Sequence, residues 1–526
     1  MLTVLIADAL SPRAVEVLRD RGIAAEVRTG LSPAELESSI GAYDGLAVRS
    51  ATKVTRPVLE AGGRLKVVGR AGIGVDNIDV AAATQRGIVV MNAPHGNAVT
   101  TAEHAIALML ALARKIPQAN ASTHAGRWEK ERFVGMELAG KTLGILGCGN
   151  VGSIVADRAH GMRMRVIAYD PYLSEERTHD LGVEKLDLDE VLKRADLITL
   201  HAPLTETTRH MIDAAALAKT RPGVLIVNCA RGELIAEADL KAAIETGHVA
   251  GAALDVFSEE PALSNPLFGM DRVIATPHLG ASTAEAQEKV AVQIAEQMAD
   301  FLLSGAVSNA VNMPSVTAEE APKLKPYIAL ATQLGSFAGQ LTRSGIRGVT
   351  VEYEGQAATL NTRPITAAAL TGLLSPMLDH VNMVNAPLIA RERDIAVTEV
   401  KHDRPTDYQT LIRLTIETDR RKRDVAGTLF GGAKPRVVEI KGITIEAELG
   451  RHMLYITNED KPGLIGHLGT ALGDAGINIA TFHLGRSAPG ADAIALIEVD
   501  QPVTDDMLNR LRRIAHVVQV ESLTFG

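Results

Sequence analysis

Short apolar runs alternate with longer segments of helical period as far as about residue 315. The runs are rich in Val, Ile and Leu, a composition typical of parallel strands buried on both faces. This alternation predicts an α/β fold with room for two doubly wound sheets, joined by a long Ala-rich helix over Ala98–Ile116. The clearest strand runs are Thr3–Ala7, Lys66–Val68, Ile88–Met91, Leu143–Leu146, Val166–Tyr169, Leu197–Leu200, Val224–Val227 and Val273–Ala275.

The pattern changes beyond that point. Three prolines within Asn312–Pro326 predict a linker. Residues 317–450 mix helix-like and strand-like runs, and the charged segment Asp419–Asp424 predicts a solvated hairpin tip between two strands. The last part of the chain has the order β-α-β-β-α-β, the ferredoxin-like arrangement. Its runs are Met453–Thr457, Gly463–Ala475, Ile477–Leu484, Ala493–Val499, Asp505–Ile514 and Val517–Leu523.

Composition excludes several classes of protein. The 526 residues include 54 basic and 63 acidic side chains, a net charge of −9, which gives no overall attraction to nucleic acid or an anionic membrane. Two cysteines, Cys148 and Cys229, form no metal-binding pattern, so no metal site is predicted. The N-terminus lacks a cationic leader, and the longest apolar run, Ala105–Ala113, is too short to cross a bilayer. We expect a cytoplasmic enzyme.

A glycine motif predicts a dinucleotide site. Gly147, Gly149 and Gly152 follow the strand Thr142–Leu146 and open a helical segment. In such a loop the glycines allow a tight turn, close approach to a pyrophosphate, and close packing of helix on strand. Asp170 ends the next strand 18 residues after Gly152, where a carboxylate binds ribose hydroxyls and repels a 2′-phosphate, so NAD is favoured over NADP. The other cofactor candidates within the loop are Asn150 and Val151.

Three later strand ends carry the side chains that oxidation of a 2-hydroxy acid needs. Arg231 offers a cation for the carboxylate, His278 a proton acceptor, and Glu260 a carboxylate to orient the imidazole. Each has an ordinary structural alternative: a surface arginine, a first-turn acid or a buried, satisfied histidine. His201 also ends a strand and competes with His278. The carboxyl ends of parallel strands form one crevice, which favours a shared catalytic role.

These motifs resemble those of the D-isomer-specific 2-hydroxyacid dehydrogenases, over essentially the whole chain. The resemblance rests on the Gly loop and on Asn228–Gly232, Asp255–Pro261 and Pro277–Ser282. It implies that Arg231 binds the substrate carboxylate, that His278 takes the hydroxyl proton while NAD accepts hydride, and that Glu260 orients the histidine. It also adds three cofactor-binding candidates: Ala230, Asp255 and Gly280.

The resemblance is greatest to long-form members that oxidise D-3-phosphoglycerate to 3-phosphohydroxypyruvate, the first step of L-serine synthesis. It implies substrate contacts from Arg49, Arg70, Gly74 and Asn97. It also implies that Arg127–Arg132 reaches the active site of a neighbouring subunit in a homodimer or homotetramer. Two positions depart from the common pattern, Ile73 where Thr is usual and Glu233 where Gly is usual, and neither removes a catalytic group.

The resemblance further implies four domains. Residues 1–95 and 283–315 would form a flavodoxin-like substrate domain around a Rossmann-type NAD domain at 96–282. Residues 317–450 would form an α+β intervening domain, and 451–526 a ferredoxin-like ACT domain. In ACT modules a loop acid binds the ammonium group of an effector, and an Asn at the next strand helps across a domain pair. The candidates for binding L-serine are Asn458, Asp460 and Asn478.

Two alternatives remain at this stage. One is a hydroxypyruvate or glyoxylate reductase of the same family, which the C-terminal sensor domain disfavours because feedback control suits a committed biosynthetic step. The other is a redox-sensing binding protein built on the same scaffold, which the intact set of Arg231, Glu260 and His278 disfavours.

Overall fold

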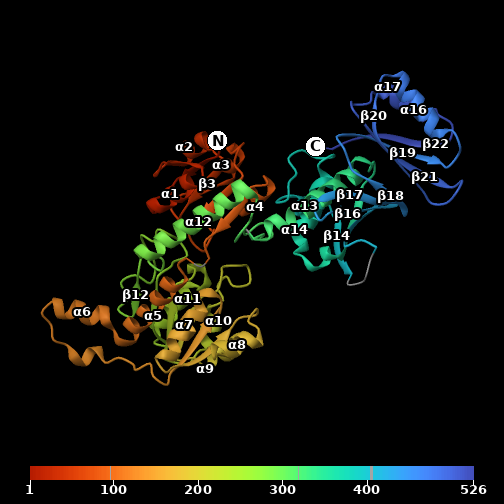
Figure 1. The fold of residues 1–526 in the computed structure, drawn as a ribbon. Helices are drawn as coiled ribbons and strands as arrows, with labels where there is room; N and C mark the ends of the chain where they lie inside the picture. Colours follow the sequence, from red (N-terminus) through yellow and green to blue (C-terminus); the bar gives the residue numbers. More distant parts are fainter. Residues whose placement is uncertain (95, 318, 403–406, 526) are drawn as a thin grey trace.

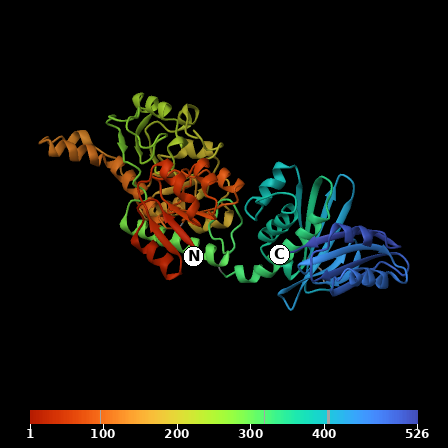
Figure 2. The same cartoon turned by 90° about the horizontal axis from the view of Figure 1, so that it is seen from above.

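The computed structural model contains four β-sheets, each with its own helices, arranged along an extended molecule (Figures 1 and 2). It describes residues 1–526 except 95, 318, 403–406 and 526. The predicted fold class is confirmed: two parallel α/β sheets precede two sheets of mixed and antiparallel strands. We name the four parts after their sheets, as the five-, seven-, six- and four-stranded units.

The five-stranded unit has the strand order β2-β1-β3-β4-β5, with all neighbours parallel. Helix α12 returns from the far end of the seven-stranded unit to cover this sheet (Figure 1). A Cβ on Gly69 would lie 2.4 Å from Sδ of Met298, so this glycine lets α12 pack close to the sheet. The elements are β1 (Thr3–Ile6), α1 (Pro12–Asp20), β2 (Ala24–Val27), α2 (Pro33–Ser39), β3 (Gly45–Val48), α3 (Arg56–Ala61), β4 (Val67–Arg70), α4 (Val80–Gln85), β5 (Val89–Asn92) and α12 (Ala284–Ser304).

The seven-stranded unit is also wholly parallel, in the order β12-β11-β10-β9-β6-β7-β8. From β6 the chain continues to β7 on one side and returns to β9 on the other, so a topological switch point lies between β6 and β9. The elements are β6 (Thr142–Leu146), α7 (Asn150–Gly161), β7 (Arg165–Tyr169), α8 (Glu175–Leu181), β8 (Glu184–Lys185), α9 (Leu188–Arg194), β9 (Leu197–Leu200), α10 (Ala214–Lys219), β10 (Val224–Asn228), α11 (Glu237–Glu245), β11 (Val249–Leu254) and β12 (Val273–Ala275).

The long Ala-rich helix is present as α5 (Ala98–Arg114), and it leads into α6 (Ile116–His124). Helix α6 projects away from the body of the molecule (Figures 1 and 2). Within the described part of the chain, no helix is both long and apolar enough to cross a membrane.

The six-stranded unit packs two helices on a sheet of order β14-β13-β15-β16-β17-β18. Helices α13 and α14 approach closely because glycines on both helices pack against the backbone of the other: a Cβ on Gly335 would lie 2.1 Å from the Ala369 carbonyl oxygen, and one on Gly372 would lie 2.1 Å from the Thr332 carbonyl oxygen. The predicted tip at Asp419–Asp424 is confirmed, since β15 ends and β16 begins within a few residues there. The elements are α13 (Ala321–Gln340), β13 (Ile346–Gly355), α14 (Thr362–Leu374), α15 (Ala386–Glu392), β14 (Ala396–His402), β15 (Thr410–Thr418), β16 (Lys422–Phe430), β17 (Lys434–Ile440) and β18 (Ile443–Ala447).

The predicted linker over Asn312–Pro326 is wrong in its extent. Asn312 is bound to β5, since its Oδ1 accepts from the Val90 amide (2.9 Å), and α13 already begins at Ala321. Pro322 lies in the first turn of α13, where a backbone N–H has no intrahelical partner to lose. Pro326 lies one turn later and removes a single hydrogen bond. Proline content alone therefore misplaced the boundary.

The four-stranded unit has the predicted β-α-β-β-α-β order and the antiparallel sheet order β20-β21-β19-β22. Its helices cover one face of the sheet, and the other face shares a hydrophobic core with the six-stranded unit. The ring of Tyr455 meets Phe337 of α13 edge to face at 5.6 Å within that shared core. The elements are β19 (His452–Glu459), α16 (Leu464–Asp474), β20 (Ile479–Arg486), β21 (Asp492–Val499), α17 (Asp505–Arg512) and β22 (Val517–Thr524).

Candidate active site

The site lies where the carboxyl ends of the two parallel sheets face each other. Arg231, just after β10, donates its Nε–H to Oδ2 of Asp76, in the loop after β4, at 2.9 Å. This ion pair joins the seven-stranded unit to the five-stranded unit. Ligands in open α/β sheets bind at the carboxyl ends of the strands, so the crevice spanned by this pair is the expected position of a substrate.

His278 and Glu260 form a hydrogen-bonded pair in this region. Nδ1 of His278 lies 2.7 Å from Oε2 of Glu260, which leaves the other ring nitrogen available for a proton transfer. Burial alone would raise the pKa of the Glu260 carboxyl, but the bond to His278 and the amide of Phe257 hold that pKa below its ordinary value. Glu260 is therefore a carboxylate at neutral pH. It fixes the tautomer of the imidazole and stabilises its protonated form.

Asp255 holds the loop that presents His278. It is fully buried, and its oxygens accept hydrogen bonds from the amides of Leu279 (2.7 Å) and Gly280 (2.8 Å). Burial would raise the pKa of this carboxyl, but hydrogen bonds, from His104 and Thr276 above all, lower it. His278 has a φ of 55°, uncommon for a side-chain-bearing residue, and its amide donates to the Asp255 carbonyl at 2.9 Å. The Asp255 carboxylate thus organises the catalytic loop, and its predicted contact with the cofactor stays a prediction.

Three arginines meet on the substrate side of the crevice. Burial, together with the positive charges of Arg231 and Arg49, lowers the pKa of the Arg70 guanidinium to about 10, so the three arginines lie close enough to repel one another. Nε of Arg70 is buried without a hydrogen-bond partner among the described residues. The negative charges of Asp76 and Asp8 act in the opposite direction and raise the pKa of Arg70. Such a cluster is ready to bind an anion.

Glycines leave room for these cations. A Cβ on Gly74 would lie 1.8 Å from Nη2 of Arg231, and a Cβ on Gly72 would lie 1.9 Å from Nη1 of Arg70. The loop at Gly72–Gly74, which contains the predicted substrate contact Gly74, therefore wraps the two guanidinium groups. Arg49 is anchored by its backbone, since its amide donates to Oδ2 of Asp8 at 2.6 Å.

Asn97, the fourth substrate candidate, opens helix α5. Its side chain is buried, and its Oδ1 has no hydrogen-bond partner among the described residues. Since an orphaned buried acceptor is costly, this atom is suited to a ligand or a water that completes its bonding.

The glycine loop has the geometry that a dinucleotide needs. Gly147 has a φ of 93°, the left-handed turn that glycine adopts readily, and a Cβ on Gly152 would lie 2.1 Å from the Gly147 carbonyl oxygen. Gly149 precedes α7, and no described residue lies within 4 Å of the position its Cβ would take. The loop is therefore open at Gly149, where free helix N–H groups can meet a pyrophosphate. Asn150 and Val151 form the first residues of α7, as the motif requires.

The remaining cofactor candidates surround that loop. Oδ2 of Asp170 accepts from the Cys148 amide at 2.8 Å, which places this carboxylate beside the glycine loop. Gly280 is packed against Asp255, whereas Ala230 lies beside Arg231 and uses its amide to bond Asn228 at 3.0 Å. The donor set and the open glycine fit NAD, with Asp170 disfavouring a 2′-phosphate.

His201 does not compete with His278. Burial lowers the pKa of its imidazole to about 4, and its Nε2 lies 2.9 Å from Oγ1 of Thr199 in its own strand. It is a neutral structural histidine. Both cysteines are free and buried, and burial raises the pKa of Cys148 to about 11, so neither thiol has a reactive thiolate.

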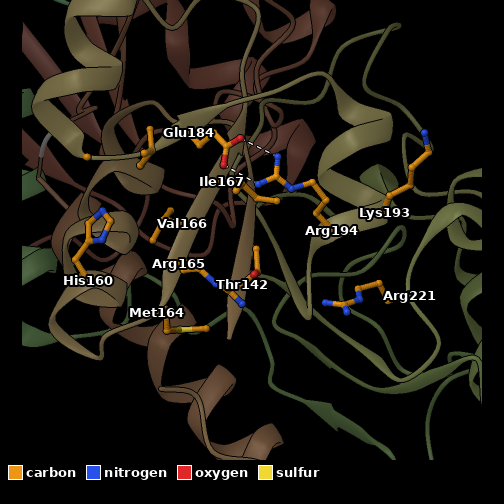
Figure 3. A pocket seen from close by; sticks show the side chains of 12 residues that line it. Thr142, His160, Met164, Arg165, Val166, Ile167, Glu184, Lys193, Arg194 and Arg221 are labelled. Atoms are coloured by element: carbon orange, nitrogen blue, oxygen red, sulfur yellow. Dashed lines mark hydrogen bonds and ion pairs between the residues drawn. The ribbon is translucent and has the colours of Figure 1, made fainter. Parts of the chain in front are cut away.

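A separate cavity of about 900 Å³ opens at the amino ends of β6 and β7 (Figure 3). Its basic side chains already have partners: Arg194 makes two 2.7 Å bonds to Glu184, and Arg221 bonds Asp196 at 2.9 Å. Because the cavity starts at Thr142 and Arg165, it lies at the opposite end of the strands from the glycine loop. It is therefore not the catalytic crevice.

One group of possible metal ligands lies far along the chain, in the six-stranded unit. Ligand atoms of Glu352, Glu354 and His402 lie within 4.8 Å of one another. Nε2 of His402 is 3.4 Å from Glu352, so the histidine already faces a protein carboxylate. None of the three residues lines the catalytic crevice, and no step of the chemistry below uses them.

The effector candidates do not meet within one four-stranded unit. Asp460 accepts hydrogen bonds from the Gly490 amide (3.0 Å) and from Arg486 (2.9 Å), and these lower the pKa of its carboxyl. Asn478 bonds Asp500 at 2.8 Å and lies just before β20, whereas Arg486 ends that strand. At about 3.3 Å per residue, the length of β20 separates the two candidates by about 25 Å. Asn458, buried beside Asp460, has an unpartnered Oδ1 among the described residues.

Two residues of the site were missed by sequence reasoning. Asp76 anchors Arg231 from the other unit, and His104 supports Asp255, with its Nε2 at 3.2 Å from Oδ1. No local motif marks either of them. The signal available for Asp76 was its position two residues after Gly74, a predicted substrate contact.

Comparison with known families identifies the class. Residues 106–280 match the NAD-binding domain of the D-isomer specific 2-hydroxyacid dehydrogenases, 323–441 match the D-3-phosphoglycerate dehydrogenase intervening domain, and 452–516 match the ACT domain. The chain is thus an NAD-dependent dehydrogenase of the D-isomer specific 2-hydroxyacid class. This agrees with the open glycine loop and the His278–Glu260 pair.

Individual relatives narrow the assignment. The D-3-phosphoglycerate dehydrogenase of Synechocystis sp. is 43% identical over 98% of this chain and 94% of its own length. That of Methanocaldococcus jannaschii is 44% identical over 99% of both chains. The chain belongs to the D-3-phosphoglycerate dehydrogenase family. Among solved structures, D-lactate dehydrogenase from Aquifex aeolicus, complexed with NAD and lactic acid, aligns with a TM-score of 0.54 and 26% identity over 60% of this chain and all of its own.

Proposed function

We propose that this chain oxidises D-3-phosphoglycerate to 3-phosphohydroxypyruvate with NAD, the first step of L-serine synthesis. The observation that carries the proposal is the pair of features at the carboxyl ends of the two parallel sheets: a cluster of three arginines and the hydrogen-bonded His278–Glu260 pair. Relatives that match over nearly the full length carry the same activity in their names. Both cysteines are free, which suits the reducing cytoplasm where we place the reaction.

The chain's residues divide the chemistry among them. Arg231 binds the substrate carboxylate and polarises the C2 oxygen, since a guanidinium makes two charge-assisted bonds to such a group. His278 accepts the hydroxyl proton on its free ring nitrogen, and Glu260 stabilises the resulting imidazolium. When bound, NAD supplies the acceptor for the hydride that leaves C2.

The buried guanidinium of Arg70, next to Arg231, favours a substrate that carries a phosphate group. Arg70, with an unpartnered Nε, and Arg49 lie beyond the carboxylate-binding arginine, so a dianionic phosphate there would relieve the repulsion among the three. The buried Oδ1 of Asn97 accepts a hydrogen bond from a hydroxyl group or a water in the same crevice.

The substrate assignment is tested by comparing phosphorylated and unphosphorylated acids. With purified protein, kcat/KM for 3-phosphohydroxypyruvate reduction, followed by NADH absorbance, is expected to exceed that for hydroxypyruvate and glyoxylate by at least about 100-fold. Two charged hydrogen bonds to phosphate are worth about that factor. Arg70→Gln should reduce the ratio of kcat/KM for the phosphorylated acid to that for the unphosphorylated acids by about tenfold. Equal turnover of the three acids would instead make the chain a general hydroxypyruvate or glyoxylate reductase.

We further propose that the chain acts as a homo-oligomer through the projecting helix α6 and the segment after it. Trp128, Ile116 and Val134 expose their apolar side chains there, which is unusual for a monomer surface. Arg132 lies in the same segment, and in the proposed assembly it reaches the crevice of a second copy. A dimer is the minimum assembly that this surface requires, and a tetramer follows if the four-stranded units also pair.

L-Serine is the effector that we propose for the four-stranded unit, bound between two copies. Asp460 and Asn478 lie at opposite ends of β20, so a ligand that contacts both requires the Asn478 end of one unit to meet the Asp460 end of another. In this arrangement Asp460 receives the ammonium group, and the unpartnered Oδ1 of Asn458 accepts a further hydrogen bond.

Substitution of Asp460 tests this effector site. Asp460→Asn is expected to raise the serine concentration for half-inhibition at least tenfold, because the ammonium group loses its carboxylate partner. Asp505→Asn, at an exposed position in the first turn of helix α17 of the same unit, serves as the matched control and should leave the inhibition curve unchanged. Equal serine inhibition in both variants would return Asp460 to a purely structural role in the Arg486–Gly490 turn.

A further inference from the structure

The six-stranded unit contains a cavity that the proposed reaction does not use. It has a volume of about 610 Å³, within the range of small-molecule sites, and lies between α14, α15 and β14. Leu370 of α14 and Ile395 beside β14 are buried and form its apolar wall. We call it the α14–α15 cavity.

Charged groups of both signs line this cavity. Arg363 and Arg391 reach it from α14 and α15, and the guanidinium of neither makes a hydrogen bond or ion pair with another described residue. Asp394 and Glu399 supply two carboxylates to the same wall, so the four side chains sum to zero charge. A polyanion such as a sugar phosphate is therefore disfavoured, and a molecule with one positive and one negative group is favoured.

Glu399 is held in a fixed position. Its two oxygens accept hydrogen bonds from Oγ1 of Thr362 (2.9 Å) and Oγ1 of Thr366 (2.5 Å). Thr366 in turn accepts from the buried hydroxyl of Tyr353 at 2.6 Å. This chain of hydroxyl groups orients the carboxylate, which retains lone pairs for a cationic ligand.

From this arrangement we propose that the α14–α15 cavity binds a free α-amino acid with an apolar side chain. The ligand carboxylate bonds Arg363 and Arg391, because guanidinium groups suit carboxylates in geometry and charge. Its ammonium group bonds Glu399 and Asp394. Its side chain packs on Leu370 and Ile395.

The position of the cavity couples this ligand to the catalytic units. Pro314 forms one side of the cavity. It comes just after the stretch of chain whose backbone is hydrogen-bonded to β5. Helix α15 packs against α4 of the five-stranded unit, and just before it Asn382 donates to the Gly87 carbonyl at 3.0 Å. A bound amino acid therefore contacts the same helix that connects the six-stranded unit to the sheet bearing Arg49 and Arg70.

Calorimetric titration of the full chain with L-leucine and L-phenylalanine tests this site. We expect at least one of the two to bind. Its counterpart lacking the ammonium group (4-methyl-2-oxopentanoate or phenylpyruvate) and its counterpart lacking the carboxylate (3-methylbutylamine or 2-phenylethylamine) should bind at least tenfold more weakly. Failure of both amino acids to bind, or equal binding of the oxo acid, would overturn the proposal.

Variants locate the binding within the chain. Arg391→Gln and Asp394→Asn should each weaken amino-acid binding at least tenfold, whereas Arg393→Gln, on the same exposed segment but outside the cavity, should not. Binding that survives both cavity variants and disappears in Asp460→Asn would place the ligand in the four-stranded unit and contradict the proposal. Because binding is measured without turnover, this result is independent of the substrate assignment.

Discussion

Replacing His278 by glutamine is expected to lower kcat for 2-hydroxy acid oxidation by about 1,000-fold, the contribution typical of a general base. Glutamine retains hydrogen bonding to Glu260 but cannot take up the substrate proton. The affinity for NADH, measured by fluorescence titration, should change less than twofold, because the glycine loop lies on different strands. Turnover near the wild-type level would remove His278 from the mechanism.

The pH dependence separates this role from a structural one. Oxidation transfers the hydroxyl proton to the His278 imidazole, so the wild-type rate of oxidation should rise with pH, and the rate of the reverse reaction should fall. Since the lowered pKa of Glu260 keeps that carboxylate charged throughout the neutral range, it does not produce this dependence. The His278→Gln variant should therefore lose the neutral-range slope of log kcat against pH. A variant that is slow but keeps the wild-type slope would contradict the assignment.

The catalytic chemistry was largely predictable because each of its groups follows an apolar strand. The strand before Gly147 and the strand before Arg231 are continuous apolar runs, and parallel sheets bring their carboxyl ends to one edge. Strand β2 was not predicted, since Ala24–Val27 is half exposed at the sheet edge and lacks such a run. The buried central strand β3 was also not among the predicted runs, whereas β5 and β12 were predicted although each lies at a sheet edge, so the position of a strand in its sheet does not decide whether the pattern reveals it.

Residues that act through other residues could not be predicted in the same way. The loop-holding role of Asp255 was not predicted, because its burial and its bonds to Leu279 and Gly280 appear only when the loop folds back over it. Asp460 and Asn478 were named together from short motifs, yet strand topology places them at opposite ends of β20. Both depend on the path of the backbone between distant segments, which local spacing does not specify.

The second large effect on activity is expected from substituting Arg231, which forms an ion pair with Asp76 across the crevice. Arg231→Gln is expected to lower kcat/KM for the phosphorylated acid by at least about 1,000-fold, since it removes both the carboxylate anchor and the charge that polarises the C2 oxygen. Arg231→Lys keeps the charge but lacks the planar fork, so its loss should be intermediate. Arg209→Gln, a neighbouring exposed arginine on the same unit, should leave kcat/KM unchanged.

Asp76→Asn distinguishes positioning from direct participation. The amide still accepts a hydrogen bond from Nε of Arg231, now 2.9 Å from the carboxylate, but no longer offsets its charge. The guanidinium stays attached to the Ala230 carbonyl through Nη1 at 2.7 Å, so we expect a loss of about tenfold, mainly in KM. In the double variant Asp76→Asn/Arg231→Gln the effect of Asp76 should vanish, because its only proposed role is to orient that arginine. Additive losses would instead assign Asp76 a contact of its own with the substrate.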